Sequence, residues 1–105
     1  MMNATTACAL TENAINKRKA CQAVALETAI AESASKWENS IATCASLCVF
    51  YTDLDTQKAY NKVIATLAPV HAMSHAEVNE AIADYMRSYG YTAEVKTPSA
   101  VRVYW

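Results

Sequence analysis

The stretch Leu26–Tyr51, with the sequence LETAIAESASKWENSIATCASLCVFY, determines the fold of this chain. Its apolar stripe spans 25 residues in seven steps, or about 3.57 residues per step, which is the period of a straight α-helix. Neither Gly nor Pro occurs among residues 1–68, so the pattern predicts one long helix from about Thr11 to Tyr51. The side chains of the stripe are Leu26, Ile30, Ala34, Trp37, Ile41, Cys44, Cys48 and Tyr51.

A second start signal lies inside this helix. The segment Ser35-Lys36-Trp37-Glu38 matches a capping box, in which a Ser side chain and a Glu three residues later begin a new helix. A break at Ser35 would fold the segment into two helices and permit a compact monomer. Because the apolar stripe keeps its phase across Ser35, we favour the continuous helix.

Two shorter helices are predicted after the long one. The first covers residues 53–67 and is ended by Pro69, because the residue before a proline avoids the helical conformation. The second covers residues 75–89. It begins with the capping box Ser74–Glu77 and ends at Gly90, the single glycine, which suits a left-handed position after a helix.

The last fifteen residues change to a period of two and predict a β-hairpin, with strands over 91–96 and 100–105. A lone hairpin is too small to be stable, so it should pack on the last helix. The chain is therefore expected to be one mostly α domain of the α+β class, covering residues 1–105. An odd-numbered loop would bring the apolar residues to one face by pairing Val95 with Val101, Ala93 with Val103, Tyr91 with Trp105 and Glu94 with Arg102.

The composition narrows the class of protein. The chain has 105 residues, 53% of them hydrophobic and 18% charged, which suits a folded domain rather than a disordered segment. Its net charge of −1 argues against a strongly basic nucleic-acid binder and against a polybasic membrane anchor. No apolar run reaches the roughly 18–20 residues of a membrane span, and no signal peptide is evident. We expect no membrane association and a cytoplasmic location.

The cysteines and histidines offer a candidate metal site. Cys44 and Cys48 are four residues apart on the long helix, and His71 and His75 have the same spacing, which matches the donor types of a Cys2His2 zinc site. Ser74, however, looks like a helix cap, so the two histidines should not share a helix. The C-x-x-C spacing of zinc knuckles is also absent. We therefore expect no metal and four reduced thiols.

No catalytic constellation is evident. A single glycine excludes a Gly-rich phosphate loop, and no spacing pairs a cysteine with a histidine and an orienting acid. Acidic pairs occur only as ordinary helix-surface residues. We expect a protein that is not an enzyme and that needs no cofactor.

The order of two helices and a hairpin resembles that of a winged helix, a fold that reads DNA with its second helix. This helix would need basic side chains to bind phosphates. Here it has Glu77, Glu80 and Asp84 against Arg87 alone, so we do not expect it to bind nucleic acid.

An interaction surface is expected on the long helix. At about 60 Å it is longer than the roughly 33 Å diameter of a compact domain of this size. Part of its apolar stripe should therefore be covered by a second copy of the chain or by a larger protein. The expected interface residues are Leu26, Ile30, Trp37, Ile41, Leu47 and Phe50.

The end of the chain, in which a helix is followed by Gly90-Tyr91 and by a hairpin that closes with Trp105, resembles that of many small phage-encoded proteins. The resemblance covers about thirty residues. It implies a viral accessory protein or a virion component, and it transfers no site residue.

Overall fold

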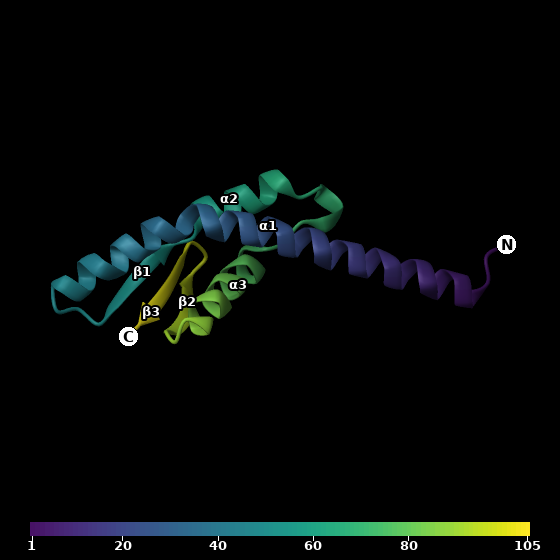
Figure 1. Cartoon of the computed structure of the whole chain (residues 1–105). Helices are drawn as coiled ribbons and strands as arrows, with labels where there is room; N and C mark the ends of the chain where they lie inside the picture. The colour runs from purple at the N-terminus through teal and green to yellow at the C-terminus, as the bar shows by residue number, and fades with distance from the viewer.

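The computed structural model describes residues 1–105 and contains three α-helices and one three-stranded sheet. Helix α1 runs the length of the molecule, with α2 along one side and the sheet and α3 on the other side in the view of Figure 1. The predicted class, a mostly helical α+β domain with a long first helix and a hairpin packed on the last helix, is confirmed. The elements are α1 (Ala4–Ser46), β1 (Tyr51–Asp55), α2 (Gln57–Thr66), a 3-10 turn (Pro69–His71), α3 (His75–Ser88), β2 (Thr92–Thr97) and β3 (Ala100–Tyr104).

Helix α1 is continuous through Ser35, as predicted, and has 43 residues. Its length of about 64 Å accounts for the longest dimension of the molecule, 66 Å. It begins earlier than predicted, because Asn3 is the cap and its side chain accepts the N–H of Thr6 at 2.8 Å. Thr11 lies inside the helix, where its hydroxyl donates to the carbonyl of Ala7.

The end of α1 was predicted at Tyr51, and this prediction is wrong. The helix stops at a turn centred on Cys48, which has a φ of 61°, a left-handed conformation usually occupied by glycine. The N–H of Cys48 donates to the carbonyl of Ala45, and the N–H of Val49 donates to the carbonyl of Cys44. These bonds satisfy carbonyl groups in the last turn of the helix. The sequence has no glycine at this position, so it gives no signal for the end of the helix.

The predicted helix over 53–67 is also wrong in its first turn. The helix begins at Gln57, and the residues before it form strand β1. Asp53 pairs across the sheet with Arg102 through two hydrogen bonds of 2.7 and 3.1 Å. The carboxylate of Asp55 accepts the N–H of Gln57 at the corner after the strand. The two acidic residues thus serve a strand and the turn that follows it.

The sheet is antiparallel, with β3 between β1 and β2. Three of the four predicted hairpin pairs form, although the loop has two residues, Pro98 and Ser99, rather than an odd number; Tyr91 and Trp105 lie outside the paired strands. A β-bulge at Lys96 takes up the extra residue and restores the alternation of faces. The confirmed pairs are Ala93 with Val103, Glu94 with Arg102 and Val95 with Val101.

The core lies where the body of α1 meets α2, α3 and one face of the sheet. Helix α1 contributes two fully buried alanines, Ala25 and Ala29, and also Trp37, whose indole Nε1 donates to the carbonyl of Asp55 at 3.1 Å. The first twenty residues contribute no buried side chain. The Cα radius of gyration is therefore 17.1 Å, against roughly 13 Å for a compact chain of this length.

Helix α3 has the predicted ends. Ser74 and Glu77 form the capping box reciprocally. Gly90 has a φ of 92°, and the N–H groups of Gly90 and Tyr91 donate back to the carbonyls of Arg87 and Met86. The chain thus turns sharply from α3 into β2, which places the hairpin against the helix.

A buried polar network joins three parts of the fold. Thr56 and Asn79 are both fully buried, and the Thr56 hydroxyl donates to Asn79 Oδ1 at 2.6 Å. The Asn79 amide donates to the carbonyl of Pro98 at 2.8 Å. The N–H of Thr56 donates to the carbonyl of Ser99. The network fastens the β2–β3 turn to α3 and to the start of α2.

We expect Asn79→Ala to destabilise the fold by about 2–3 kcal/mol, because it leaves the buried Thr56 hydroxyl without its partner and removes the amide that donates to the Pro98 carbonyl. Urea unfolding measures the change. Asn61→Ala is the control, since Asn61 is an exposed helical asparagine, and should change the free energy of unfolding by no more than about 0.5 kcal/mol. Equal stability of the two variants would contradict the role given to the network.

The Asp53–Arg102 pair predicts a pH dependence. The guanidinium of Arg102 holds the pKa of Asp53 below its ordinary value. A lowered folded-state pKa stabilises the fold above the unfolded-state pKa, near 4, and the effect is lost as the pH falls through the folded value. The stability difference between the wild type and Asp53→Asn should be constant near neutral pH and should shrink below about pH 4. A difference that stays constant down to about pH 2 would count against the pair.

Candidate functional site

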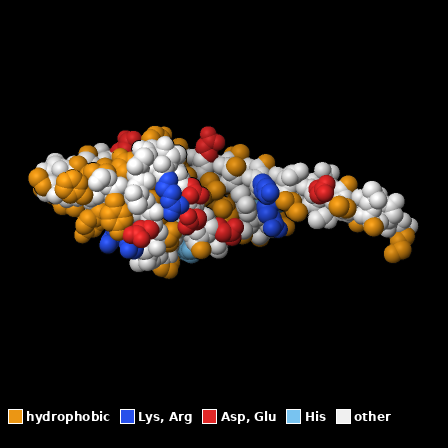
Figure 2. Space-filling view, turned by 90° about the horizontal axis from the view of Figure 1, so that it is seen from below, with side chains coloured by type: hydrophobic (Ala, Val, Ile, Leu, Met, Phe, Trp, Pro, Cys, Tyr) orange, Lys and Arg blue, Asp and Glu red, His pale blue; other side chains and the backbone are white.

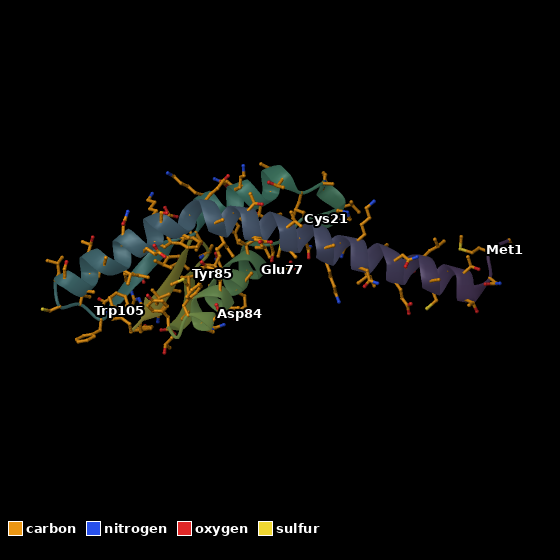
Figure 3. All side chains as sticks on the ribbon, in the orientation of Figure 1. Met1, Cys21, Glu77, Asp84, Tyr85 and Trp105 are labelled. Carbon is orange, nitrogen blue, oxygen red and sulfur yellow. The ribbon has the colours of Figure 1, made fainter.

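The N-terminal part of α1 is a helical arm, defined here as residues 4–20. All of its side chains are exposed. It is about 25 Å long and projects beyond the rest of the molecule, called here the body. Met1 lies near the tip of the arm and Cys21 lies where the arm joins the body (Figure 3). The contact that marks this junction is a hydrogen bond from Arg18 to the carbonyl of Val70 at 3.3 Å. Apart from this contact near its base, the arm has its surface free to meet another molecule.

Charge is divided along α1. The arm contains Lys17, Arg18 and Lys19 against one acid, Glu12. The remainder of the helix has the reverse balance, with one base against three acids, Glu27, Glu32 and Glu38. In Figure 2 a basic group lies where the arm meets the body, and acidic groups are spread over the body. One helix thus presents a basic segment followed by an acidic one.

The expected interface residues divide into three groups. Ile30 and Trp37 are buried in the core of the chain itself, so the expectation that they face a partner is corrected. Leu26 and Ile41 are half-buried against that core. Leu47 and Phe50 are about 70% exposed in the turn between α1 and β1. The body covers the central stripe of α1, and the uncovered parts are the two ends of the helix.

The end opposite the arm is an exposed apolar surface, called here the apolar end. Leu47 and Phe50 lie there beside Trp105, whose N–H donates to the carbonyl of Phe50. Figure 2 shows hydrophobic side chains gathered at this end of the molecule. The tip of the arm is also apolar, because Met1 and Met2 are exposed. Apolar groups therefore stand at both ends of a charged helix.

A pocket of about 140 Å³ lies between α1 and α3 and is called here the aromatic pocket. Figure 3 shows Tyr85 where these two helices approach each other. Seven of the eight lining residues are apolar or aromatic, and the eighth is an acid. The lining residues are Ala34, Trp37, Glu38, Ile41, Tyr85, Met86, Tyr89 and Tyr91.

The aromatic rings of the pocket are held by one another. The rings of Tyr85 and Tyr89 meet edge to face, with centroids 5.2 Å apart. Tyr91 meets the ring of Trp105 in the same way at 6.4 Å, which keeps the expected closeness of these two residues. The hydroxyl of Tyr89, burial and the Glu38 carboxylate together raise the pKa of Tyr85 above its ordinary value. These surroundings favour the neutral form of the Tyr85 hydroxyl.

The four candidate metal ligands do not come together. The carbonyl of His71 accepts from Gln22, and Cys44 lies 22 residues further along α1, or about 33 Å away. His75 stacks on a tyrosine ring, and its Nδ1 lies 3.1 Å from the carbonyl of Pro98. No group of three or more potential ligands gathers anywhere in the chain, and the four cysteines are free.

The surface of α3 opposes phosphate binding. Its single base, Arg87, is engaged by Glu80 and Asp84 at 2.8 and 2.7 Å and also donates to the carbonyl of Ala93. The element order places α3 immediately before the hairpin, and β1 pairs with the last strand. The helix that would enter a DNA groove is nevertheless acidic on its exposed side.

Sequence reasoning missed the aromatic pocket. The signal for it was present in α3, where Tyr85 and Tyr89 are four residues apart and so share a face. What the sequence did not indicate was the approach of α1 to this face, which depends on the packing of the sheet beneath both helices.

No helix of the structure combines the length and the apolar character that a membrane span requires. Comparison with protein family models, with curated proteins and with solved structures finds no match for this chain.

Proposed function

We propose that this chain is a non-enzymatic interaction protein that pairs with a second copy of itself through α1. The observation that supports this proposal is the arm, about 25 Å of helix with no covered side chain. Most helical stability in proteins comes from packing of an apolar face, and a second chain would supply that packing here. Docking of the arm on a larger protein is the alternative within the same class.

The order of groups along α1 favours a second copy in antiparallel orientation. Aligning residue 18, in the basic segment, with Glu32 places segments of opposite net charge against each other twice in a two-fold pair, with Glu12 and Glu38 as the one like-charged pair of this register. The same register brings Met2 opposite Cys48, beside the exposed Leu47, because both separations are sixteen residues. The apolar tip of one copy would then cover the apolar end of the other.

The biological setting follows from the resemblance of the chain's end to small phage-encoded proteins. We propose a viral accessory protein or a virion component, located in the cytoplasm or in the virion. A self-pairing rod of this kind suits a structural or scaffolding role. The proposal assigns no catalytic residue and no cofactor.

Charge reversal tests the pairing. We expect Lys17→Glu combined with Lys19→Glu to weaken dimerisation at low salt by about tenfold or more, since each reversal acts at two symmetric contacts. Sedimentation equilibrium measures the dissociation constant. Adding Glu27→Lys and Glu38→Lys to the same chain should restore the dimer, because the two segments then exchange their signs.

The control variant is Lys58→Glu with Lys96→Glu, which changes the net charge equally but lies outside α1. It should leave the dissociation constant within about twofold of the wild type. A wild-type protein that stays monomeric at high concentration, or an equal effect of both charge changes, would refute pairing through α1.

DNA binding is the second candidate, favoured only by the winged-helix order of elements. Because Arg87 is already paired with two acids, we expect no retardation of duplex DNA in a mobility-shift assay at low salt. A shift that weakens steeply as salt is added would revive this candidate.

A further inference from the structure

We propose that the aromatic pocket between α1 and α3 binds a quaternary ammonium group. Three tyrosine rings and one tryptophan line it, together with a single carboxylate, Glu38. Aromatic faces attract cations through the negative charge of their π-systems, and aromatic cages are a recurrent means of holding methylated ammonium groups. This site lies outside the arm, so the inference goes beyond the proposed pairing.

The size of the pocket fits such a group. Its volume is about 140 Å³. An engineered apolar cavity of about 150 Å³ accepts benzene, which has six heavy atoms. A tetramethylammonium group has five, so it fills the available space. The pocket is partly open to solvent, which leaves a way out for a chain attached to the nitrogen.

The charge of the pocket favours a cation over a neutral apolar molecule. Glu38 is on the rim and makes no ion pair within the chain, so its charge is available to a ligand. No Lys or Arg lines the pocket. Arg87, on the same helix as the two tyrosines, is held by Glu80 and Asp84. A bound cation would therefore meet one unpaired carboxylate and no competing base.

The polar groups of the aromatic residues also suit this ligand. The indole Nε1 of Trp37 is engaged by the carbonyl of Asp55, so the tryptophan offers only its ring. A quaternary ammonium has no N–H to donate and needs no hydrogen-bond acceptor. It can therefore be desolvated in a pocket half of whose lining residues are aromatic. A primary ammonium has three N–H donors and loses more hydration on entering such a pocket.

Choline and its neutral isostere, 3,3-dimethylbutan-1-ol, test the proposal on the full-length protein. NMR shifts of the Met86 and Ile41 methyl groups, recorded at constant ionic strength, report binding in the pocket. We expect choline to bind at least about fivefold more tightly than the isostere, a difference within the range of cation–π stabilisation. Equal binding of choline and the isostere, or binding of neither, would count against a free small molecule as the ligand.

A second experiment uses a short peptide with trimethyllysine, compared with the same peptide carrying unmodified lysine. Preferential binding of the methylated peptide also supports the site and identifies a protein side chain as the source of the ammonium group. Stronger binding of choline identifies a free small molecule. If choline does not bind more tightly than its neutral isostere, and the trimethyllysine peptide does not bind more tightly than the unmodified peptide, the pocket is not an ammonium site.

Substitutions distinguish the contribution of an aromatic ring of the pocket from that of its carboxylate. Tyr89 is 67% exposed, so its replacement should not unfold the protein. Tyr89→Phe should keep choline binding within about twofold, whereas Tyr89→Ala and Glu38→Gln should each weaken it by about threefold or more, because only the ring face and the carboxylate act on the cation. The matched controls, Phe50→Ala and Glu12→Gln, lie outside the pocket and should leave binding unchanged. Equal losses in the controls would refute the assignment.

Discussion

The amide of Asn79 is the interaction on which the body of this protein depends. It is fully buried on α3, and its two ends reach the start of α2 and the turn between β2 and β3. A buried amide without partners costs the fold more than most single contacts contribute, so the three elements must stay together to satisfy it. Once the hairpin turn is fastened, β3 is placed to receive β1, and β1 in turn anchors Trp37 of α1 through the carbonyl of Asp55.

Because these contacts depend on one another, only some parts of the fold could be predicted from the sequence. The continuous α1, the capping box at Ser74 and the stop at Gly90 follow from local patterns, and all three are found. Strand β1 could not be predicted in the same way. Its sequence, Tyr51–Asp55, offers one buried apolar residue, and its two acids suit a helix cap equally well. What makes it a strand is its pairing along β3, a distant strand that the hairpin brings opposite and that places Arg102 across from Asp53.

The same reasoning separates the correct and incorrect parts of the candidate surface. Periodicity identified the stripe of α1 correctly but could not tell which part of it the chain's own sheet covers. Ile30 and Trp37 face the core because the sheet and α3 lie under the middle of the helix, and Leu47 remains exposed because the helix continues past them. The aromatic pocket is a product of the same packing, since α3 brings Tyr85 and Tyr89 to the side of α1.

The arm is a continuation of a helix rather than a flexible tether. This difference determines how a molecule bound to the arm is oriented relative to the body. A disordered tail of the same length would limit only how far apart two bound molecules could be. A helical arm also sets their relative rotation, because each residue advances the chain by about 1.5 Å and turns it by about 100°. One residue inserted between Ala20 and Cys21 would thus leave the reach of the arm almost unchanged while turning whatever it binds by more than a quarter of a circle about the α1 axis.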